Sequence, residues 1–340
     1  MTDTAYASVN HQVRLAARPS GLPTPEVWEH TEEPVAAPED GRFLVRVTHL
    51  SLDPAMRGWM NDVRSYVPPV RIGEVMRAFG GGAVVASAHP GFAVGDQVTG
   101  TFGAQEYAES DGAGVQKVDL STAAMPTHLA ALGMTGMTAY FGLFDVGALA
   151  AGETVVVSGA AGAVGSVVGQ LAKIKGGRAV GIAGGRQKCA YLVDELGFDA
   201  AVDYRADDFR AELRAAVPDG IDVYFDNVGG PVLDAALARL RSHARVVLCG
   251  AISQYNSDRG MVGPANYLSL LINRARMEGF LVFDYADRYP QAAAEMAGWL
   301  RDGRLRSEED VVRGGVGDFG EVLLRLFRGD NTGKLILQLG

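Results

Sequence analysis

Apolar runs alternate with amphipathic stretches along the second half of the chain. The first of them are TVVVS (154–158), AVGSVVGQLAKIKG (163–176), RAVGIA (178–183) and QKCAYLVDELG (187–197). The alternation continues through AAVDY (200–204), DDFRAELRAAV (207–217), IDVYFDNVG (221–229), PVLDAALARLRS (231–242), ARVVLCGAIS (244–253), YLSLLINRARM (267–277) and GFLVFDY (279–285). Strands that are buried on both faces of a parallel sheet are near-continuous apolar runs, and helices connect them. We therefore predict an α/β protein with a doubly wound parallel (Rossmann) sheet of about six strands.

Glycine and proline turns separate shorter strand-like runs in the first 120 residues. These runs are FLVRVTHL (43–50), GAVVAS (82–87) and QVTG (97–100). Short strands joined by such turns predict a small β barrel or sandwich. After a helix-rich tail from Gln291, the run GKLILQL (333–339) predicts a strand that returns to this first domain. Two domains suit 340 residues, because a domain typically has roughly 150.

Composition narrows the class of protein. With 48% hydrophobic and 21% charged residues, the chain suits a globular fold rather than disorder. A net charge of −9 without any run of Lys or Arg argues against a nucleic-acid partner. Residues 1–14 are polar, unlike a secretory signal, and glycines interrupt the apolar stretches 121–144 and 154–172. We therefore expect a cytoplasmic protein without a membrane partner.

One glycine motif carries specific chemistry. The run GAAGAVG (159–165) directly follows the first apolar strand of the alternating region and begins its first helix. In this context Gly162 lets the backbone approach a pyrophosphate, and Gly165 permits close packing of helix on strand. The N–H groups at the helix N-terminus then bind the anion. Because Ala160 replaces the first glycine of G-x-G-x-x-G, the motif alone also suits a loop that only turns the chain.

The end of the next predicted strand favours NADP over NAD. An NAD site commonly has a carboxylate about 20 residues after the motif, but no acid stands between the motif and Asp194. Gly184 and Gly185 leave room instead, and the cations Arg186 and Lys188 follow. A 2′-phosphate carries close to two negative charges and favours such cations. We expect NADPH as the cofactor, although either cation alone also suits a solvated first helical turn.

Motifs along most of the chain form a recognisable set. They are SLDPAMRGWM (51–60), SYVPPV (65–70), GEVMRA (73–78), GMTGMTAYFGL (133–143), VVVSGAAGAVGSVVGQLAK (155–173), GIAGG (181–185), IDVYFDNVGG (221–230), CGAISQYN (249–256), RARMEGFLVFDY (274–285) and NTGKL (331–335). Together they resemble the zinc-independent medium-chain dehydrogenase/reductases. Within that family they are similar to the prostaglandin reductase and alkenal-one oxidoreductase group, which includes leukotriene 12-hydroxydehydrogenase-like and curcumin reductase-like enzymes. The resemblance extends from about Val13 to Leu337.

The resemblance implies an activity and a domain plan. The activity is NADPH-dependent reduction of the carbon–carbon double bond of an α,β-unsaturated ketone or aldehyde, by hydride transfer to the β-carbon and protonation of the enolate. The domain plan is a GroES-like catalytic domain in residues 1–127 and 301–340, with a Rossmann nucleotide domain in residues 128–300. Such enzymes are usually homodimers.

The resemblance also implies the cofactor contacts. Gly162, Ala163, Val164 and Gly165 would hold the pyrophosphate, Lys188 and Tyr204 would contact the 2′-phosphate end, and Asn227 would lie along the cofactor. Around the nicotinamide it implies Cys249, Gly250, Ile252, Ser253, Tyr255, Phe280, Leu281 and Val282, with Asn331 closing on it. Arg186 has no clear counterpart in the family pattern.

Conjugate reduction requires a hydrogen-bond donor to the carbonyl oxygen, on which the negative charge of the enolate develops. A tyrosine hydroxyl is a suitable neutral donor. The resemblance points to Tyr255, in the turn after the fifth predicted strand, and Tyr66 in the SYVPP loop would approach from the opposite wall. The other interpretations are a tyrosine stacked on the cofactor ribose for Tyr255 and an ordinary loop aromatic for Tyr66.

The metal-binding residue types argue against catalytic zinc. Zinc alcohol dehydrogenases hold the catalytic metal with Cys, His and often Glu. Here Cys189 and Cys249 both fall in the predicted nucleotide domain, and the six histidines show no H-x-x-x-H spacing. We expect no metal, which favours a reductase over an alcohol dehydrogenase. His49 suits a proton relay, but a surface or core histidine is the simpler interpretation.

Two alternatives stay open at this point. One is an NADPH quinone reductase of the same superfamily, and the other is a crystallin-like protein that binds NADPH without turnover. Tyr255 and the complete SYVPP and FDY segments argue against the non-catalytic alternative. The small-molecule substrate itself is not predicted by the sequence.

Overall fold

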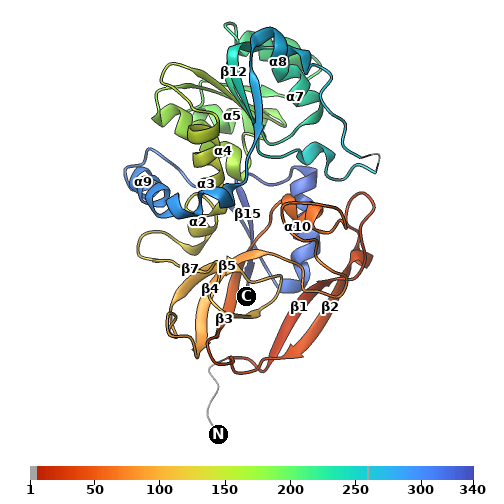
Figure 1. The fold of residues 1–340 in the computed structure, drawn as a ribbon, viewed down its shortest axis with the longest axis vertical. Helices are drawn as coiled ribbons and strands as arrows, with labels where there is room; N and C mark the ends of the chain where they lie inside the picture. Colours follow the sequence, from red (N-terminus) through yellow and green to blue (C-terminus); the bar gives the residue numbers. More distant parts are fainter. Residues whose placement is uncertain (1–5, 259) are drawn as a thin grey trace. The chain divides into compact units, whose positions relative to one another are not determined.

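The structure, a computed structural model, describes residues 6–258 and 260–340 (Figure 1). The chain forms two compact units. The first unit comprises the chain up to Leu129 with Asp310–Asp330 and Leu335–Gly340, and the second comprises Ala130–Glu309 with Asn331–Lys334. The domain limits expected from the sequence stay a prediction, and their residues 1–5 lie outside the described part of the chain.

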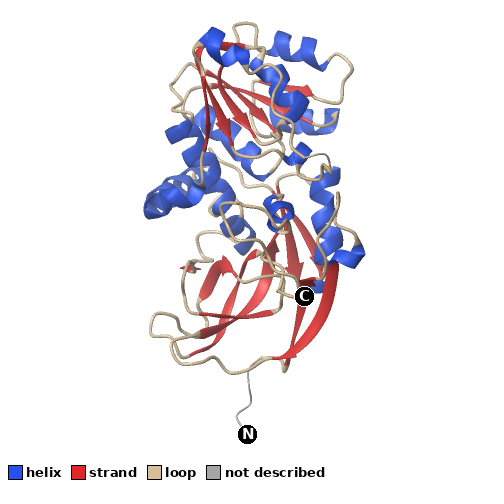
Figure 2. Ribbon diagram, turned by 45° about the vertical axis from the view of Figure 1, so that its right-hand side comes forward, coloured by secondary structure: helices blue, strands red, loops and turns tan. Residues whose placement is uncertain are grey.

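The second unit contains a six-stranded parallel sheet in the order β10-β9-β8-β11-β12-β13. Its strands are β8 (Thr154–Ser158), β9 (Arg178–Ala183), β10 (Ala200–Asp203), β11 (Ile221–Asp226), β12 (Leu240–Leu248) and β13 (Arg276–Gly279). Its helices are α3 (Met134–Phe141), the π-helical turn Gly142–Val146, α4 (Ala163–Ile174), α5 (Arg186–Asp194), α6 (Phe209–Ala216), α7 (Gly230–Leu237), the 3-10 turn Ile252–Gln254, α8 (Leu268–Asn273), the 3-10 turn Val282–Arg288 and α9 (Tyr289–Arg301). Helices cover both faces of this sheet (Figure 2).

Strand β8 shows why its sequence is continuously apolar. Val155 and Val157 belong to the core that α3, α4 and α9 cover, whereas Val156 belongs to a second core under α6 and α7. All three valines are fully buried. Successive side chains of a strand point to opposite faces, so a strand between two cores has no polar position. The six-stranded α/β prediction is confirmed on this basis.

One predicted strand and two predicted helix ends are wrong. The helix predicted over 267–277 ends at Asn273, because Arg276 already begins β13. The run 279–285 is not a strand, because β13 ends at Gly279 and Val282–Arg288 is a 3-10 turn. Its aromatic residues pack on the helical core instead, where Tyr285 stacks on Phe141 with ring centroids 4.7 Å apart. The helix predicted to reach residue 242 ends at Leu237, because Leu240 already begins β12 and pairs with β11.

The first unit is built on a seven-stranded sheet with the path β14-β15-β3-β4-β5-β7, from which β6 branches at β3. These strands are β3 (Phe43–Ser51), β4 (Phe79–Ser87), β5 (Gln97–Thr101), β6 (Tyr107–Ser110), β7 (Gln116–Lys117), β14 (Glu309–Gly314) and β15 (Lys334–Leu339). The remaining elements are the hairpin of β1 (Val9–Leu15) and β2 (Trp28–Pro34), the 3-10 turns Pro25–Val27 and Val316–Asp318, and the helices α1 (Ala55–Trp59), α2 (Met125–Leu129) and α10 (Phe319–Arg328). Strand β15 pairs antiparallel with β3, with Ile336 opposite Ser51, so the predicted returning strand is confirmed.

No helix in the described ranges is long and apolar enough to span a membrane.

Candidate cofactor and active site

The glycine loop joins the end of β8 to the start of α4. A Cβ atom on Gly165 would lie 2.4 Å from the Gly159 carbonyl oxygen and 2.8 Å from Ala160 Cα, so only glycine fits there. Gly162 is the N-cap residue of α4 in extended conformation and provides no side-chain cap. The first N–H groups of a helix have no intrahelical partner. The N-terminus of α4 can therefore donate them to an anion such as a pyrophosphate.

The segment Asn331–Lys334 lies directly beside the glycine loop. The Gly333 N–H donates to the Ala161 carbonyl at 2.8 Å, and Gly333 forms an isolated parallel bridge with Gly162. Lys188 Nζ donates to the Asn331 carbonyl at 2.6 Å, which ties α5 to the same segment. The structure thus brings together three predicted cofactor residues, Gly162, Lys188 and Asn331, that are far apart in sequence.

At the end of β9, a glycine lets two side chains approach the backbone closely. A Cβ on Gly184 would lie 2.9 Å from the Tyr204 ring and 3.0 Å from Arg205 Nε. The Arg205 guanidinium lies 5.7 Å from the centre of the Tyr204 ring. Asp203 links the residues that follow β9 and β10, because its Oδ1 accepts the N–H group of Gly185 at 2.8 Å and that of Arg205 at 2.9 Å. Burial raises the pKa of Asp203, but these two N–H groups outweigh it and lower the pKa overall.

Arg205 was not predicted from the sequence. It places a guanidinium beside Tyr204 and Gly184, and it lines the same pocket as Arg186 of α5. A planar guanidinium binds phosphate through paired hydrogen bonds. Its position directly after the predicted Tyr204 was the available signal, since the residues that follow adjacent parallel strands meet at one sheet edge.

Tyr255 is bonded to its own turn. Its hydroxyl oxygen accepts the Ala251 N–H at 3.1 Å, and a Cβ on Gly250 would lie 2.9 Å from that oxygen. A hydroxyl that accepts a hydrogen bond still has its own proton to donate. The arrangement therefore suits a neutral donor to a carbonyl oxygen. Nearby, burial and the Asp226 carboxylate raise the pKa of Cys249 to about 12, so its thiol stays protonated at neutral pH.

The other predicted nicotinamide residues divide into two groups. Ile252 and Ser253 are bonded through their N–H groups to the carbonyls of Asn227 and Val228. Phe280, by contrast, packs into the helical core, where a Cβ on Gly142 would lie 2.6 Å from its ring. Val282 is buried, and its carbonyl accepts the Tyr289 hydroxyl at 2.9 Å, whereas Leu281 is partly exposed between the two.

Tyr66 lies in the first unit, on the exposed segment 61–69. Its ring is half exposed, and its hydroxyl accepts the indole N–H of Trp59 at 3.3 Å. The guanidinium of Arg77 lies 5.5 Å from the centre of the Trp59 ring. The first unit therefore presents one tyrosine hydroxyl on a loop.

Metal-ligand side chains do not gather anywhere in the described ranges. No group of three or more His, Cys, Asp or Glu residues there could hold a metal ion. Burial lowers the pKa of His49, whose Nδ1 lies 2.9 Å from the Thr48 hydroxyl. The absence of a catalytic metal stays a prediction that chelation can test.

Known proteins match the whole chain. A family model described as the N-terminal domain of oxidoreductase matches residues 11–118, and one described as zinc-binding dehydrogenase matches residues 163–298. The NADPH-dependent curcumin reductase of Escherichia coli is 41% identical over 335 residues, covering 97% of this chain and 97% of that protein. The chain belongs to the zinc-independent medium-chain dehydrogenase/reductases.

Other members of this family are similarly close. The 2-alkenal reductase (NADP(+)-dependent) of Nicotiana tabacum is 39% identical over 299 residues, which cover 87% of each chain. The crystal structure of CurA from Vibrio vulnificus in complex with NADPH has a TM-score of 0.92 and 43% identity, covering 97% of this chain and 99% of that chain. The resemblance to the medium-chain dehydrogenase/reductases that the motifs indicated is confirmed.

Proposed function

We propose that the protein is an NADPH-dependent oxidoreductase that reduces the carbon–carbon double bond of α,β-unsaturated ketones and aldehydes. The observation that carries the proposal is the nucleotide end of the second unit. There the uncapped N-terminus of α4 follows a loop whose Gly165 tolerates no side chain, and Lys188 lies beside the same loop. Reductases of such double bonds are among the relatives of this chain.

The residues of the second unit fit a dinucleotide with a 2′-phosphate. The N–H groups of Ala163, Val164 and Gly165 would bind the pyrophosphate. Lys188, Tyr204 and Arg205 would contact the phosphorylated ribose, and the absence of a side chain on Gly184 lets Tyr204 and Arg205 lie against the end of β9. When bound, NADPH supplies the hydride that adds to the β-carbon of the substrate.

Tyr255 would act on the substrate oxygen. Its hydroxyl oxygen is fixed by the Ala251 N–H, so the O–H proton has a limited set of directions. A positioned donor of this kind stabilises charge as it develops on the carbonyl oxygen. Tyr66 remains a proposed second donor.

Cofactor consumption tests the reaction class. NADPH oxidation is followed at 340 nm with a medium-chain enone, an alkenal and a small quinone. Turnover of the enone or alkenal, with little quinone turnover, is the expected result. Quinone turnover alone would move the assignment to a quinone reductase. Tight NADPH binding without turnover of any of the three would indicate a crystallin-like binding protein.

We also propose a homodimer that forms through the edge of the parallel sheet. Six exposed apolar side chains belong to the segment 261–272, which precedes the edge strand β13 in the chain: Met261, Val262, Tyr267, Leu268, Leu271 and Ile272. Exposed apolar patches of this kind commonly mark interfaces. Around a two-fold axis at Met277, antiparallel pairing of two β13 strands would place Arg276 opposite Glu278, so the edge is complementary to itself.

Light scattering tests this assembly. Leu271→Asp should convert a dimer into a monomer, because it places charge in the proposed apolar interface. Val94→Asp is the matched control, since Val94 is a comparably exposed apolar residue, 66% against 75%, in the first unit. A wild-type monomer, or a Leu271→Asp dimer, would contradict the proposal.

We also propose a cytoplasmic location. The proposed domain limits are residues 1–127 with 301–340 for the first domain and residues 128–300 for the second.

A further inference from the structure

A buried carboxylate lies where β8 and β11 end. Asp226, the last residue of β11, is 1% exposed, and Ser158, the last residue of β8, is fully buried. A single oxygen of Asp226, Oδ1, accepts four hydrogen bonds. They come from the Ser158 hydroxyl at 2.8 Å, the Tyr224 hydroxyl at 3.0 Å, the Val228 N–H at 3.1 Å and the Gly229 N–H at 3.0 Å.

All four partners of this oxygen are donors. A carboxyl oxygen accepts such hydrogen bonds, and they are stronger when the group is ionised. Burial raises the pKa of Asp226, while the Gly229 N–H and the Ser158 hydroxyl oppose that rise. Among the described residues, no Lys or Arg forms an ion pair with Asp226. A buried carboxyl group costs stability unless it is hydrogen-bonded, so the four donors stabilise Asp226 in this position.

The carboxylate shapes the turn that follows β11. Gly229 and Gly230 both have positive φ, 71° and 56°. Asp226 satisfies the N–H groups of Val228 and Gly229 within this turn. The Ser158 hydroxyl also accepts the Asn227 N–H at 2.9 Å, and the Ser158 carbonyl accepts Asn227 Nδ2 at 2.8 Å. The turn is therefore attached both to Asp226 and to the strand that leads into the glycine loop.

The turn after β11 also holds the segment that carries Tyr255. The Asn227 carbonyl accepts the Ile252 N–H at 3.2 Å. The Val228 carbonyl accepts both the N–H and the hydroxyl of Ser253, at 3.2 and 2.7 Å. A continuous series of hydrogen bonds thus connects the Asp226 side chain, the turn, the 3-10 turn Ile252–Gln254 and Tyr255.

We propose that Asp226 is a positioning residue that sets the nicotinamide side of the cofactor site, acting through the Asn227–Gly230 turn on the segment that carries Tyr255. The proposal rests on the proposed function, because it takes Asn227 and Tyr255 as site residues. Asp226 touches neither substrate nor cofactor in this assignment. Its contribution is to fix the backbone from which both site residues extend.

The test compares two buried aspartates of the same strand. Asp226→Asn keeps the shape and one acceptor oxygen but loses the charge, and Asp226→Ala removes every contact of the carboxylate. Asp222→Asn is the matched control, because Asp222 is 9% exposed and lies at the opposite end of β11, where it accepts the Thr154 N–H. Each variant is characterised by its thermal midpoint, its NADPH Kd from fluorescence titration, and kcat and KM for an enone.

The expected result is a graded loss at Asp226 alone. Asp226→Ala should raise the NADPH Kd and lower kcat by about tenfold or more each, because misplacement of a reacting group is costly. The Kd and kcat of Asp226→Asn should lie between those of Asp226→Ala and wild type. Those of Asp222→Asn should stay within about threefold of wild type. If Asp226→Ala does not fold, Ser158→Ala replaces it, since it removes the Asn227 N–H acceptor and one donor to Asp226.

Two other results overturn the proposal in different ways. One such result is that the Asp226 or Ser158 variants lose thermal stability yet keep Kd and kcat at the level of Asp222→Asn. Asp226 would then have only a structural role. A wild-type protein that fails to bind NADPH at all would instead refute the proposed function on which the inference rests.

Discussion

Tyr255 in the second unit and Tyr66 in the first carry the same hydroxyl group on two different kinds of support. The Tyr255 oxygen accepts a main-chain N–H four residues away, and Ile252 and Ser253, just before Tyr255, are bonded to the turn after β11. Tyr66 is 49% exposed and is bonded to the side chain of Trp59. One hydroxyl is fixed by main-chain hydrogen bonds near a sheet edge, the other by side chains around a loop.

An arginine closes the base of the Tyr66 loop. Arg18 donates to the carbonyl of Met60 at 2.5 Å and to that of Val70 at 2.9 Å, the residues that flank segment 61–69. The Val70 N–H donates to the Trp59 carbonyl at 2.8 Å, which closes the same base through the main chain. The two ends of the loop are therefore held together by one side chain and one main-chain bond.

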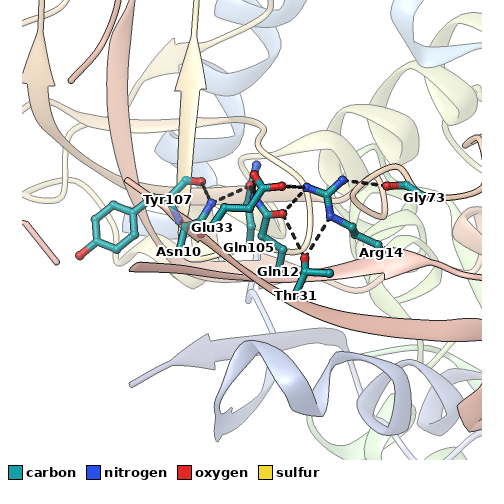
Figure 3. A network of polar contacts seen from close by, with 8 residues as sticks. All are labelled: Asn10, Gln12, Arg14, Thr31, Glu33, Gly73, Gln105 and Tyr107. Carbon is teal, nitrogen blue, oxygen red and sulfur yellow. Dashed lines mark hydrogen bonds and ion pairs between the residues drawn. The ribbon is translucent and has the colours of Figure 1, made fainter. Parts of the chain in front are cut away.

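A second arginine holds the chain just beyond that loop. Figure 3 shows Arg14 on β1 donating to the Gly73 carbonyl at 2.7 Å. The same guanidinium contacts Gln12 at 2.6 Å and Glu33 of β2 at 2.5 Å. Asn10 and Gln12 connect this network to Gln105 at 3.0 Å.

From the different supports of the two tyrosines, we expect substitutions near Tyr255 to change the chemical step. Substitutions around Tyr66 should instead change the geometry of a loop.

The largest effect is expected at Tyr255. Tyr255→Phe should lower kcat by about 10- to 1000-fold, as the loss of one oxyanion donor does, with little change in NADPH affinity. Tyr66→Phe is the paired variant and should cost less than about threefold. Stopped-flow or steady-state enone reduction measures both. Equal losses in the two variants would remove the distinction between them.

A smaller effect is expected at Lys188. Lys188→Ala should raise the KM for NADPH by about tenfold or more, because a hydrogen bond to a charged group is worth about 1.5–3 kcal/mol. NADH, which lacks the 2′-phosphate, should be affected little. Comparable losses with NADPH and NADH would assign Lys188 to its bond with the Asn331 carbonyl rather than to phosphate recognition.

Arg18 tests the loop of the first unit. Arg18→Leu should raise the KM for the enone by about three- to tenfold through a displaced loop, while the NADPH Kd stays unchanged. Faster proteolysis within segment 61–69 should accompany the change, and Arg18→Lys should restore part of the enone affinity. An Arg18→Leu enzyme with wild-type enone kinetics would show that Arg18 does not position the loop for catalysis.

The smallest effect is expected from chelation. Prolonged EDTA treatment should leave enone turnover unchanged, since the residue types near both tyrosines provide no metal cluster in the described ranges. Loss of turnover that zinc restores would overturn the metal-free assignment.

The sequence predicted the parts of the protein that depend on local pattern. Five of the six parallel strands follow directly from apolar runs, because strands that are largely buried on both faces are mostly apolar. The predicted strand 279–285 failed because an apolar run that packs on helices has the same composition as a buried strand. Strand β2 was not predicted, since most of its residues are exposed and it lacks that signal.

The candidate site divides in the same way. The glycine motif between a predicted strand and a predicted helix located the loop at 159–165, because a helix N-terminus and the turn before it are formed by neighbours in sequence. Arg205 and Asp226 were not predicted as site-supporting residues. Asp226 accepts a hydrogen bond from Ser158, 68 residues away, and no short motif can reveal such a partner.

The sequence by itself determined the fold class, the family and the position of the phosphate loop, since each is encoded by periodicity or by residues close together in the chain. Only the tertiary structure decided how the tyrosines are held. Arg18 meets the carbonyls of Met60 and Val70, 42 and 52 residues away, and Asp226 joins the ends of two strands. Hydrogen bonds between such distant residues exist only after the chain has folded, and they set the geometry that distinguishes the two hydroxyl groups.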